Sequence, residues 1–246
     1  MKQENIHTKE HHDFYREILQ LLADNQFKFL IGGGAALQKY TSINRDSKDL
    51  DLFSTNNEFH SIIRFFKEKG FETEYTDVRW LAKVFQGEAF IDLIFNTVNN
   101  LCPVDDSWFE YAIPGELLGV PVLYIAPEEL IWCKIYIHNR ERYDAADINH
   151  IILKQGHRLD WERIFKRLDQ HWHLLLGQFI NFFFVYPSER DIIPRWLFEK
   201  LLKRAQSQYD LPTSVEKVCL GPIIDQTQYS IDIKKWNFKT FTIKTV

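Results

Sequence analysis

The stretch that decides the fold covers residues 27–54 and reads FKFLIGGGAALQKYTSINRDSKDLDLFS. Residues 27–31 form an apolar run that ends at a glycine, which predicts a short buried strand. The three glycines at 32–34 permit a tight turn and let a ligand approach the backbone closely. A short helix is predicted over 35–40, with its N-terminus at that turn. Because backbone N–H groups and the positive end of the helix dipole meet there, the sequence predicts an anion site.

The second half of the stretch places two carboxylates on one face of a strand. Residues 48–54 alternate between charged and apolar side chains, which predicts a strand with a period of two. Asp49 and Asp51 then share one face, while Leu50 and Leu52 point to the core. Neighbouring carboxylates repel each other and lose solvation, and a divalent cation between them relieves both costs. Since Mg²⁺ takes carboxylate and phosphate oxygens, the sequence predicts a site for a metal–nucleotide complex.

This arrangement resembles the signature of the nucleotidyltransferase superfamily typified by DNA polymerase β. That signature is an apolar strand, a glycine pair, a short helix and then Asp-x-Asp between apolar residues. The sequence is most similar to the bacterial stand-alone members, which include those of toxin–antitoxin and abortive-infection systems. The resemblance covers residues 27–154. Many members have Ser after the second glycine, but Gly34 or Ala35 stands here, so phosphate contact would rest on backbone N–H groups alone.

The resemblance implies how a nucleotide would bind. Asp49 and Asp51 would hold two Mg²⁺ ions that bridge a nucleoside triphosphate, with ATP among the candidates. Gly33 and Gly34 would present backbone N–H groups to the β- and γ-phosphates. The glycine turn and the Asp-x-Asp strand would therefore serve one site.

A third carboxylate is predicted at Asp92, which lies alone in the apolar segment 89–95. An unpaired buried charge is costly, so this residue needs a partner or a metal. The alternative is an aspartate on a strand at the edge of the sheet, with its carboxylate in water. The resemblance implies a third carboxylate on a strand beside the Asp-x-Asp strand. Asp92 would then bind the second ion and help to activate the acceptor hydroxyl.

Three cationic residues are candidates for neutralising the phosphates. Arg45 and Lys48 would stabilise the leaving group, or would instead pair with the aspartates for structure without metal. Lys134 lies on a helix predicted over 127–138, which begins with Pro and two Glu. The resemblance implies that Lys134 reaches back to the nucleotide; the alternative is that it extends to solvent. In that alternative the charged residues after it form a structural cluster, namely Arg140, Arg142, Asp144 and Asp147.

The predicted fold class is α/β, with a small mixed sheet of the nucleotidyltransferase type, packed helices and a following all-helical region. We expect a catalytic domain over 1–125, a helical domain over 126–210 and a C-terminal tail over 211–246 that packs on the body as an extended or irregular segment. Residues 117–125 are predicted as the last strand of the sheet. The cleft would lie between sheet and helical region, with the acidic strands on one wall and Lys134 on the other.

The composition is that of a well-packed globular protein, since 45% of the 246 residues are hydrophobic and 15% are aromatic. A net charge of −4 argues against a general nucleic-acid binder, although a local basic patch would suffice for an RNA end. The three cysteines form neither a disulfide framework nor a zinc pattern. No signal region or membrane span is predicted. We therefore expect a cytoplasmic protein.

The predicted reaction transfers a nucleoside monophosphate from a nucleoside triphosphate to an acceptor hydroxyl and releases pyrophosphate. The sequence leaves the acceptor open between a tRNA end, a protein hydroxyl and a small aminoglycoside-like molecule. One alternative is a non-catalytic nucleotide- or protein-binding module, such as an antitoxin-like partner, against which the three aspartates argue. Another is a metal-dependent phosphohydrolase, which would not need the glycine turn before Asp-x-Asp.

Overall fold

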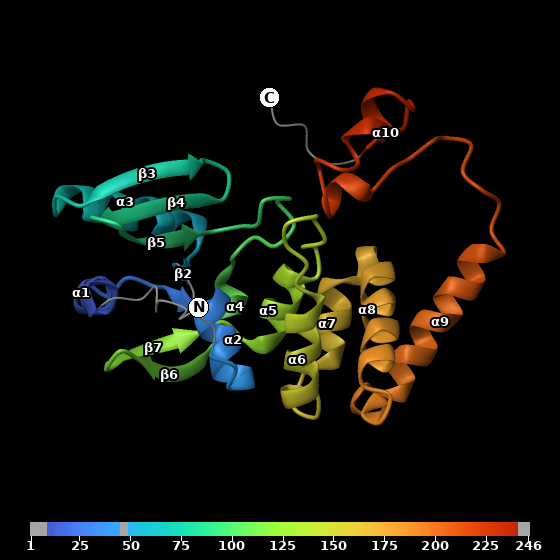
Figure 1. Cartoon of the computed structure of the whole chain (residues 1–246), viewed down its shortest axis with the longest axis horizontal. Helices are drawn as coiled ribbons and strands as arrows, with labels where there is room; N and C mark the ends of the chain where they lie inside the picture. The colour runs from blue at the N-terminus through green and yellow to red at the C-terminus, as the bar shows by residue number, and fades with distance from the viewer. Residues whose placement is uncertain (1–8, 45–48, 241–246) are drawn as a thin grey trace, which may run out of the picture. The chain divides into compact units, whose positions relative to one another are not determined.

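The computed structural model of the protein describes residues 9–44 and 49–240. Two compact units divide the chain, Met1–Leu130 and Ile131–Val246. The first contains the β-sheet and the second is helical (Figure 1). The predicted α/β class, a mixed sheet with packed helices and a helical region after it, is confirmed. The three-part division into domains stays a prediction.

A seven-stranded mixed sheet organises the first unit, in the order β3-β4-β5-β2-β1-β7-β6. The central strands come from the decisive stretch: β1 is antiparallel to β2 and parallel to β7, and β2 is parallel to β5. The strands are β1 (Leu30–Ile31), β2 (Leu50–Phe53), β3 (Glu72–Asp77), β4 (Leu81–Gln86), β5 (Ala89–Ile94), β6 (Ile113–Leu117) and β7 (Val120–Tyr124). The glycine turn and the Asp-x-Asp strand therefore lie at the middle of the sheet.

Within the part of the first unit that the structure describes, four helices accompany the sheet, namely α1 (Lys9–Asp24), α2 (Gly33–Thr41), α3 (Asn56–Glu68) and α4 (Asp106–Glu110). The amphipathic helix α1 buries Phe14, Ile18 and Leu22 and packs against β5 and β7. Helix α2 packs against β2, and α3 packs against β3 and β4. These contacts bring α1 and α2 to the strands that carry the candidate site.

The strand predicted over 117–125 is present as β7 (Val120–Tyr124), but its predicted start is wrong, because Leu117 ends a separate strand, β6. The structure has a β6–β7 hairpin instead, and its turn residues Leu118 and Gly119 have φ angles of 52° and 81°. A two-residue turn with positive φ at both positions matches the twist of a hairpin. Leucine rarely adopts positive φ, so the Leu-Gly pair does not resemble a typical turn sequence and the connection was not predicted.

The second unit is built from helices, and α5 (Pro127–Lys134) spans the boundary that leads into it. The others are α6 (Ala145–Gln155), α7 (Trp161–Arg167), α8 (Trp172–Val185), α9 (Arg195–Tyr209) and α10 (Ser230–Lys234). Helix α10 lies in the tail that was predicted to be extended or irregular, and that prediction is wrong for these residues. Alternation over five residues is too short to separate a strand from a helical turn.

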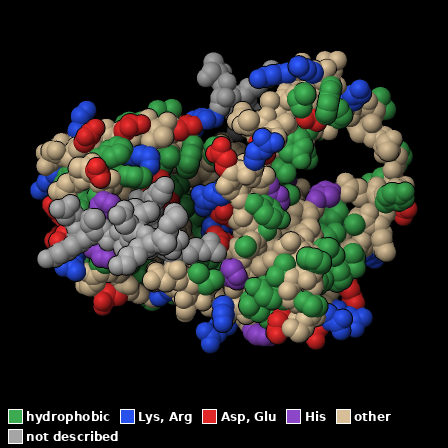
Figure 2. Space-filling model, in the orientation of Figure 1, with side chains coloured by type: hydrophobic (Ala, Val, Ile, Leu, Met, Phe, Trp, Pro, Cys, Tyr) green, Lys and Arg blue, Asp and Glu red, His purple; other side chains and the backbone are tan. Residues whose placement is uncertain are grey.

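The sequence of helix α8 is apolar nearly all round, which predicts a helix buried on every side, but only one face is buried. Leu175, Phe179 and Phe182 lie in the core, whereas Ile180 is 52% exposed and Phe184 is 84% exposed. Figure 2 shows hydrophobic side chains gathered on the surface over α8 and α9. Among the described residues, no helix is both long enough and apolar enough to cross a membrane.

Candidate active site

The glycine turn and the Asp-x-Asp strand interlock at Gly33 and Asp51. Gly33 has a φ of +49°, and a Cβ atom added to it would lie 1.7 Å from Asp51 Oδ2. The backbone N–H of Gly32 donates a hydrogen bond to the carbonyl oxygen of Asp51 at 3.0 Å. The carboxylate of Asp51 therefore occupies the space that any side chain at position 33 would need. Glycine at this position is required by both its backbone conformation and this close approach.

Helix α2 begins directly at this turn. Its first residue is Gly33, two residues earlier than predicted, and the N-cap residue Gly32 supplies no side-chain hydrogen bond. The first turn also contains no acidic residue. The first N–H groups of a helix have no partner within it, so they are directed at whatever lies before the helix. The N-terminus of α2 thus keeps the character of the predicted anion site, beside the carboxylate of Asp51.

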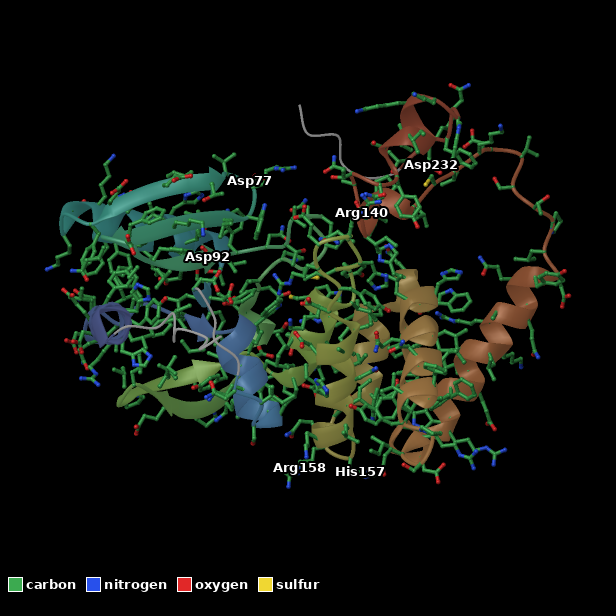
Figure 3. All side chains as sticks on the ribbon, viewed as in Figure 1. Asp77, Asp92, Arg140, His157, Arg158 and Asp232 are labelled. Atoms are coloured by element: carbon green, nitrogen blue, oxygen red, sulfur yellow. The ribbon has the colours of Figure 1, made fainter. Side chains whose placement is uncertain are left out.

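The pairing of β2 with β5 brings the second and third predicted carboxylates together. In this parallel pair Asp51 is directly opposite Asp92, so the two side chains leave the same face of neighbouring strands. Figure 3 labels Asp92 on β5. Strand β5 lies between β4 and β2, so the alternative of a carboxylate on an edge strand is wrong. Among the described residues, no three His, Cys, Asp or Glu side chains already form a closed metal-binding group.

Tyr15 on α1 shows that all three carboxylates share one neighbourhood. The pKa of its hydroxyl is raised to about 12, first by burial and then by the charges of Asp49, Asp51 and Asp92. A charge shifts a pKa in this way only when it lies near the titrating group. The side chain of Tyr15 is 5% exposed. Sequence analysis missed this residue because one tyrosine on the apolar face of a helix belongs to no motif.

Asp92 has a partner that sequence analysis also missed. Lys83 on β4 is directly opposite Asp92 in the antiparallel β4–β5 pair, and its Nζ donates to Asp92 Oδ1 at 2.6 Å. Burial raises the pKa of Asp92, the hydrogen bond and charge of Lys83 lower it, and the charge of Asp49 raises it again. The two-residue turn Gly87-Glu88 gives a signal that could have found Lys83, since counting residue pairs outward from Gln86 and Ala89 puts Lys83 opposite Asp92.

Of the three cationic residues predicted to bind phosphate, Lys134 alone lies within the described residues. Arg45 and Lys48 lie outside the described residues. Lys134 belongs to the second unit, where it is 5% exposed and does not extend to solvent. Its Nζ lies 2.5 Å from Asp144 Oδ2 and 2.8 Å from Asp147 Oδ2. The ammonium group is therefore already held by two carboxylates.

The alternative predicted a structural cluster of arginines and aspartates with Lys134 in solvent; the pairing of Arg142 with Asp144 agrees with it, but Lys134 is itself part of the cluster. Arg142 Nε donates to the other oxygen of Asp144 at 3.0 Å. Although burial by itself raises the pKa of Asp144, the hydrogen bond from Arg142 and the charge of Lys134 hold that pKa below its usual value. Binding of the nucleotide by Lys134 stays a prediction.

A family model described as "Nucleotidyl transferase of unknown function (DUF2204)" matches residues 11–172. This match includes most of α1, the glycine turn, Asp49, and the strands β2, β4 and β5, which carry Asp51, Lys83 and Asp92. The chain belongs to this nucleotidyltransferase family. Comparison with curated proteins gave no match.

Several solved structures are similar to this nucleotidyltransferase. An antigenic nucleotidyltransferase-like protein from Paracoccidioides brasiliensis is 18% identical, with a TM-score of 0.48 over 75% of this chain and 92% of that one. ANT(2″)-Ia, in complex with adenylyl-2″-tobramycin, is 16% identical, with a TM-score of 0.46 over 66% and 97%. The lincosamide antibiotic adenylyltransferase LnuA, with lincomycin bound, is 15% identical, with a TM-score of 0.40 over 58% and 96%.

The first unit of the nucleotidyltransferase thus gathers most of the predicted site. Gly33, Asp51 and Asp92 meet through the β1–α2 turn and the β2–β5 pair, and the charge of Asp49 acts on both Tyr15 and Asp92. Gly34 lies in the first turn of α2. Sheet pairing and the helix start account for this arrangement without any contribution from the second unit.

Proposed function

We propose that this chain transfers a nucleoside monophosphate from a nucleoside triphosphate to an acceptor hydroxyl and releases pyrophosphate, with Mg²⁺ as its cofactor. The observation that carries the proposal is the close approach of Asp51 to Gly33, 1.7 Å from the position of an added Cβ atom. It joins a metal-ligating carboxylate to a helix N-terminus suited to phosphate. A metal–nucleotide complex needs both at one place.

The donor set at this place suits Mg²⁺. Asp49, Asp51 and Asp92 supply carboxylate oxygens, which are hard ligands that Mg²⁺ prefers together with substrate phosphates. The raised pKa of Tyr15 supports a shared negative environment that a cation would relieve. Asp49 and Asp51 would hold the ion. When bound, Mg²⁺ would neutralise the triphosphate and polarise its phosphoryl oxygens.

The residues of the chain itself would do the positioning. The N–H groups of Gly33 and Gly34 at the start of α2 would bind phosphate oxygens. Arg45 and Lys48, in the segment before β2, would add positive charge at the leaving pyrophosphate. Asp92 would lie on the acceptor side and orient the acceptor hydroxyl. The resemblance implies a second ion, which would need Asp92 as a ligand. However, Lys83 already donates a hydrogen bond to one oxygen of Asp92.

The contacts of Lys134 support a structural role for it. Its ammonium group is 2.5 Å from one buried aspartate and 2.8 Å from another. Moving it to a phosphate would take this cation away from two buried carboxylates, which is strongly unfavourable. We place the proposed reaction in the cytoplasm, where nucleoside triphosphates are abundant. The proposal includes a tRNA end, a protein hydroxyl and a small molecule as acceptors, and the tRNA or protein acceptor would suit a toxin–antitoxin system.

Two radioactive labels separate the proposal from its alternatives. The chain is incubated with Mg²⁺, cell extract and each triphosphate, labelled in one set on the α-phosphate and in another on the γ-phosphate. A transferase puts the α-label into an extract component and the γ-label into pyrophosphate. A phosphohydrolase releases the γ-label as orthophosphate, and a binding module gives no turnover; either result contradicts the proposal. Separating RNA, protein and small molecules then shows which class carries the α-label.

A further inference from the structure

Lys83 is fixed at the acceptor side of the candidate site by the sheet itself. It lies opposite Asp92 in the β4–β5 pair, and the side chains of Lys83 and Asp92 are 21% and 13% exposed. Its Nζ lies 2.6 Å from Asp92 Oδ1 and 3.8 Å from the centre of the Phe90 ring. The ammonium group therefore has a carboxylate as one partner and an aromatic face as the other.

The position of Lys83 conflicts with a second divalent ion at Asp92. Such an ion would compete with the ammonium group for the oxygens of Asp92. Among the described residues, Asp92 is the only ion-pair partner of Lys83. A displaced ammonium group would keep only the Phe90 ring, which attracts a cation more weakly than a carboxylate does. It would also remain beside a doubly charged ion, and this repulsion is strong in a partly buried site.

We propose that Lys83 takes the place of the second divalent ion. The ammonium group holds Asp92 in position and supplies the positive charge on the acceptor side, so the nucleotide complex contains one divalent ion, at Asp49 and Asp51. The inference rests on the proposed function. Lys83 is a positioning residue that acts through Asp92, and it differs from the two ions that the resemblance implies.

In this arrangement every bond, electron pair and proton of the transfer step can be accounted for. The acceptor oxygen forms a bond to the α-phosphorus, and the bond between that phosphorus and the bridging oxygen breaks. The electron pair of the broken bond leaves with pyrophosphate. The proton of the acceptor hydroxyl passes to Asp92 Oδ2, the oxygen that Lys83 does not hold. The proton acceptor is thus a residue that the sheet places at the site.

The test counts ions bound to the nucleotide complex. The purified full chain is saturated with each of the four nucleoside α,β-methylene triphosphates in turn, which cannot release pyrophosphate. Mn²⁺, which takes the same oxygen ligands as Mg²⁺, is then titrated in, and the unbound ion is measured by electron paramagnetic resonance. We expect one bound Mn²⁺ for the parent and two for Lys83→Met. The dissociation constant of a second ion should be lower for the variant than for the parent by about tenfold or more.

Two variants act as controls. Lys83→Arg keeps the positive charge and should bind one ion like the parent. Lys69→Met removes a lysine that also faces an aromatic ring, with its Nζ 5.6 Å from the centre of the Phe65 ring, but that lies at the end of α3 and not opposite Asp92 in the sheet. It should also bind one ion. Thermal melts confirm that each variant is folded before ions are counted.

Each outcome decides the inference. Two ions in the parent complex would overturn it while leaving the proposed function intact, and this count needs no variant. One ion in a folded Lys83→Met complex would overturn it as well. A parent that binds no nucleotide or no Mn²⁺ with any of the four analogues would overturn both the inference and the proposed function.

Discussion

Replacing Gly33 with alanine should damage the site through a single methyl group. Two separate effects act at this position. The φ angle of +49° is unfavourable for any residue with a Cβ atom, and that atom would lie 1.7 Å from Asp51 Oδ2 and 2.5 Å from Asp51 Cγ. No rotation of the methyl group relieves this overlap, so the carboxylate of Asp51 or the start of α2 must move. The variant should therefore lose both stability and ligand binding.

The two effects have different magnitudes. A left-handed backbone at a non-glycine residue costs about 1–2 kcal/mol. Overpacking that forces a neighbouring side chain to shift adds about 1–3 kcal/mol. The free energy of unfolding of Gly33→Ala should thus fall by about 2–5 kcal/mol. In the parent, a hundredfold excess of Mg²⁺–nucleotide over its dissociation constant should stabilise the fold by about 2.7 kcal/mol. Gly33→Ala should lose most of this gain, because the carboxylate that we propose binds the ion is displaced.

Gly87→Ala is the matched control. Gly87 has a similar φ of +62°, but a Cβ atom there would meet nothing within 4 Å. This variant pays the backbone cost alone, about 1–2 kcal/mol, and should keep the full stabilisation by ligand. Thermal melts of the three proteins, with and without Mg²⁺ and a non-hydrolysable triphosphate, measure both quantities. The reasoning is refuted if Gly33→Ala melts like Gly87→Ala and shows the same ligand shift as the parent.

Three further predictions use the same melting assay. Asp51→Asn removes one of the clustered charges, so without metal it should be at least as stable as the parent. It should, however, lose most of the stabilisation by Mg²⁺–nucleotide. A large loss of stability without metal would favour a structural role for Asp51. Lys134→Met removes the buried ammonium group that contacts both Asp144 and Asp147 and should lower the free energy of unfolding by about 3–5 kcal/mol, so a change below about 1 kcal/mol would contradict the buried cluster. In the folded state the pKa of Asp144 lies below its usual value, so ionised Asp144 stabilises the fold. This stabilisation is fully present above the unfolded pKa of about 3.9 and is lost as pH falls through the folded pKa. Between pH 6 and pH 3 the parent should therefore lose more stability than Asp144→Asn, and equal losses would show that Asp144 is not the group responsible.

The part of the site that could be predicted from sequence is the part encoded locally. Gly33 and Asp51 are eighteen residues apart in one strand–turn–helix–strand segment, and their residue types are restricted by the backbone and by charge. Asp92 could be predicted because a lone carboxylate in an apolar strand needs an explanation. These features depend on the chemistry of a few neighbouring residues, so the sequence pattern was sufficient.

The rest of the site depends on pairing between segments. Lys83 meets Asp92 only through the register of the β4–β5 hairpin, and a lysine within a strand gives no motif. Tyr15 approaches the aspartates because α1 packs on β5, which no local pattern encodes. For Lys134, the sequence shows the helix and the nearby aspartates. It does not show whether the ammonium group turns to solvent, to a nucleotide or to Asp144.

The central claim is that Asp51 and the glycine turn form the site of nucleotidyl transfer, and the ratio of products tests it most directly. Parent and Asp51→Asn are incubated with Mg²⁺, an α-labelled triphosphate and the extract fraction that accepts the label, and both pyrophosphate and incorporated label are measured. The account predicts equal amounts of the two products for the parent, and for Asp51→Asn a rate lower by about a hundredfold or more. Orthophosphate in place of pyrophosphate, or a folded Asp51→Asn that transfers label at the parent's rate, would contradict it.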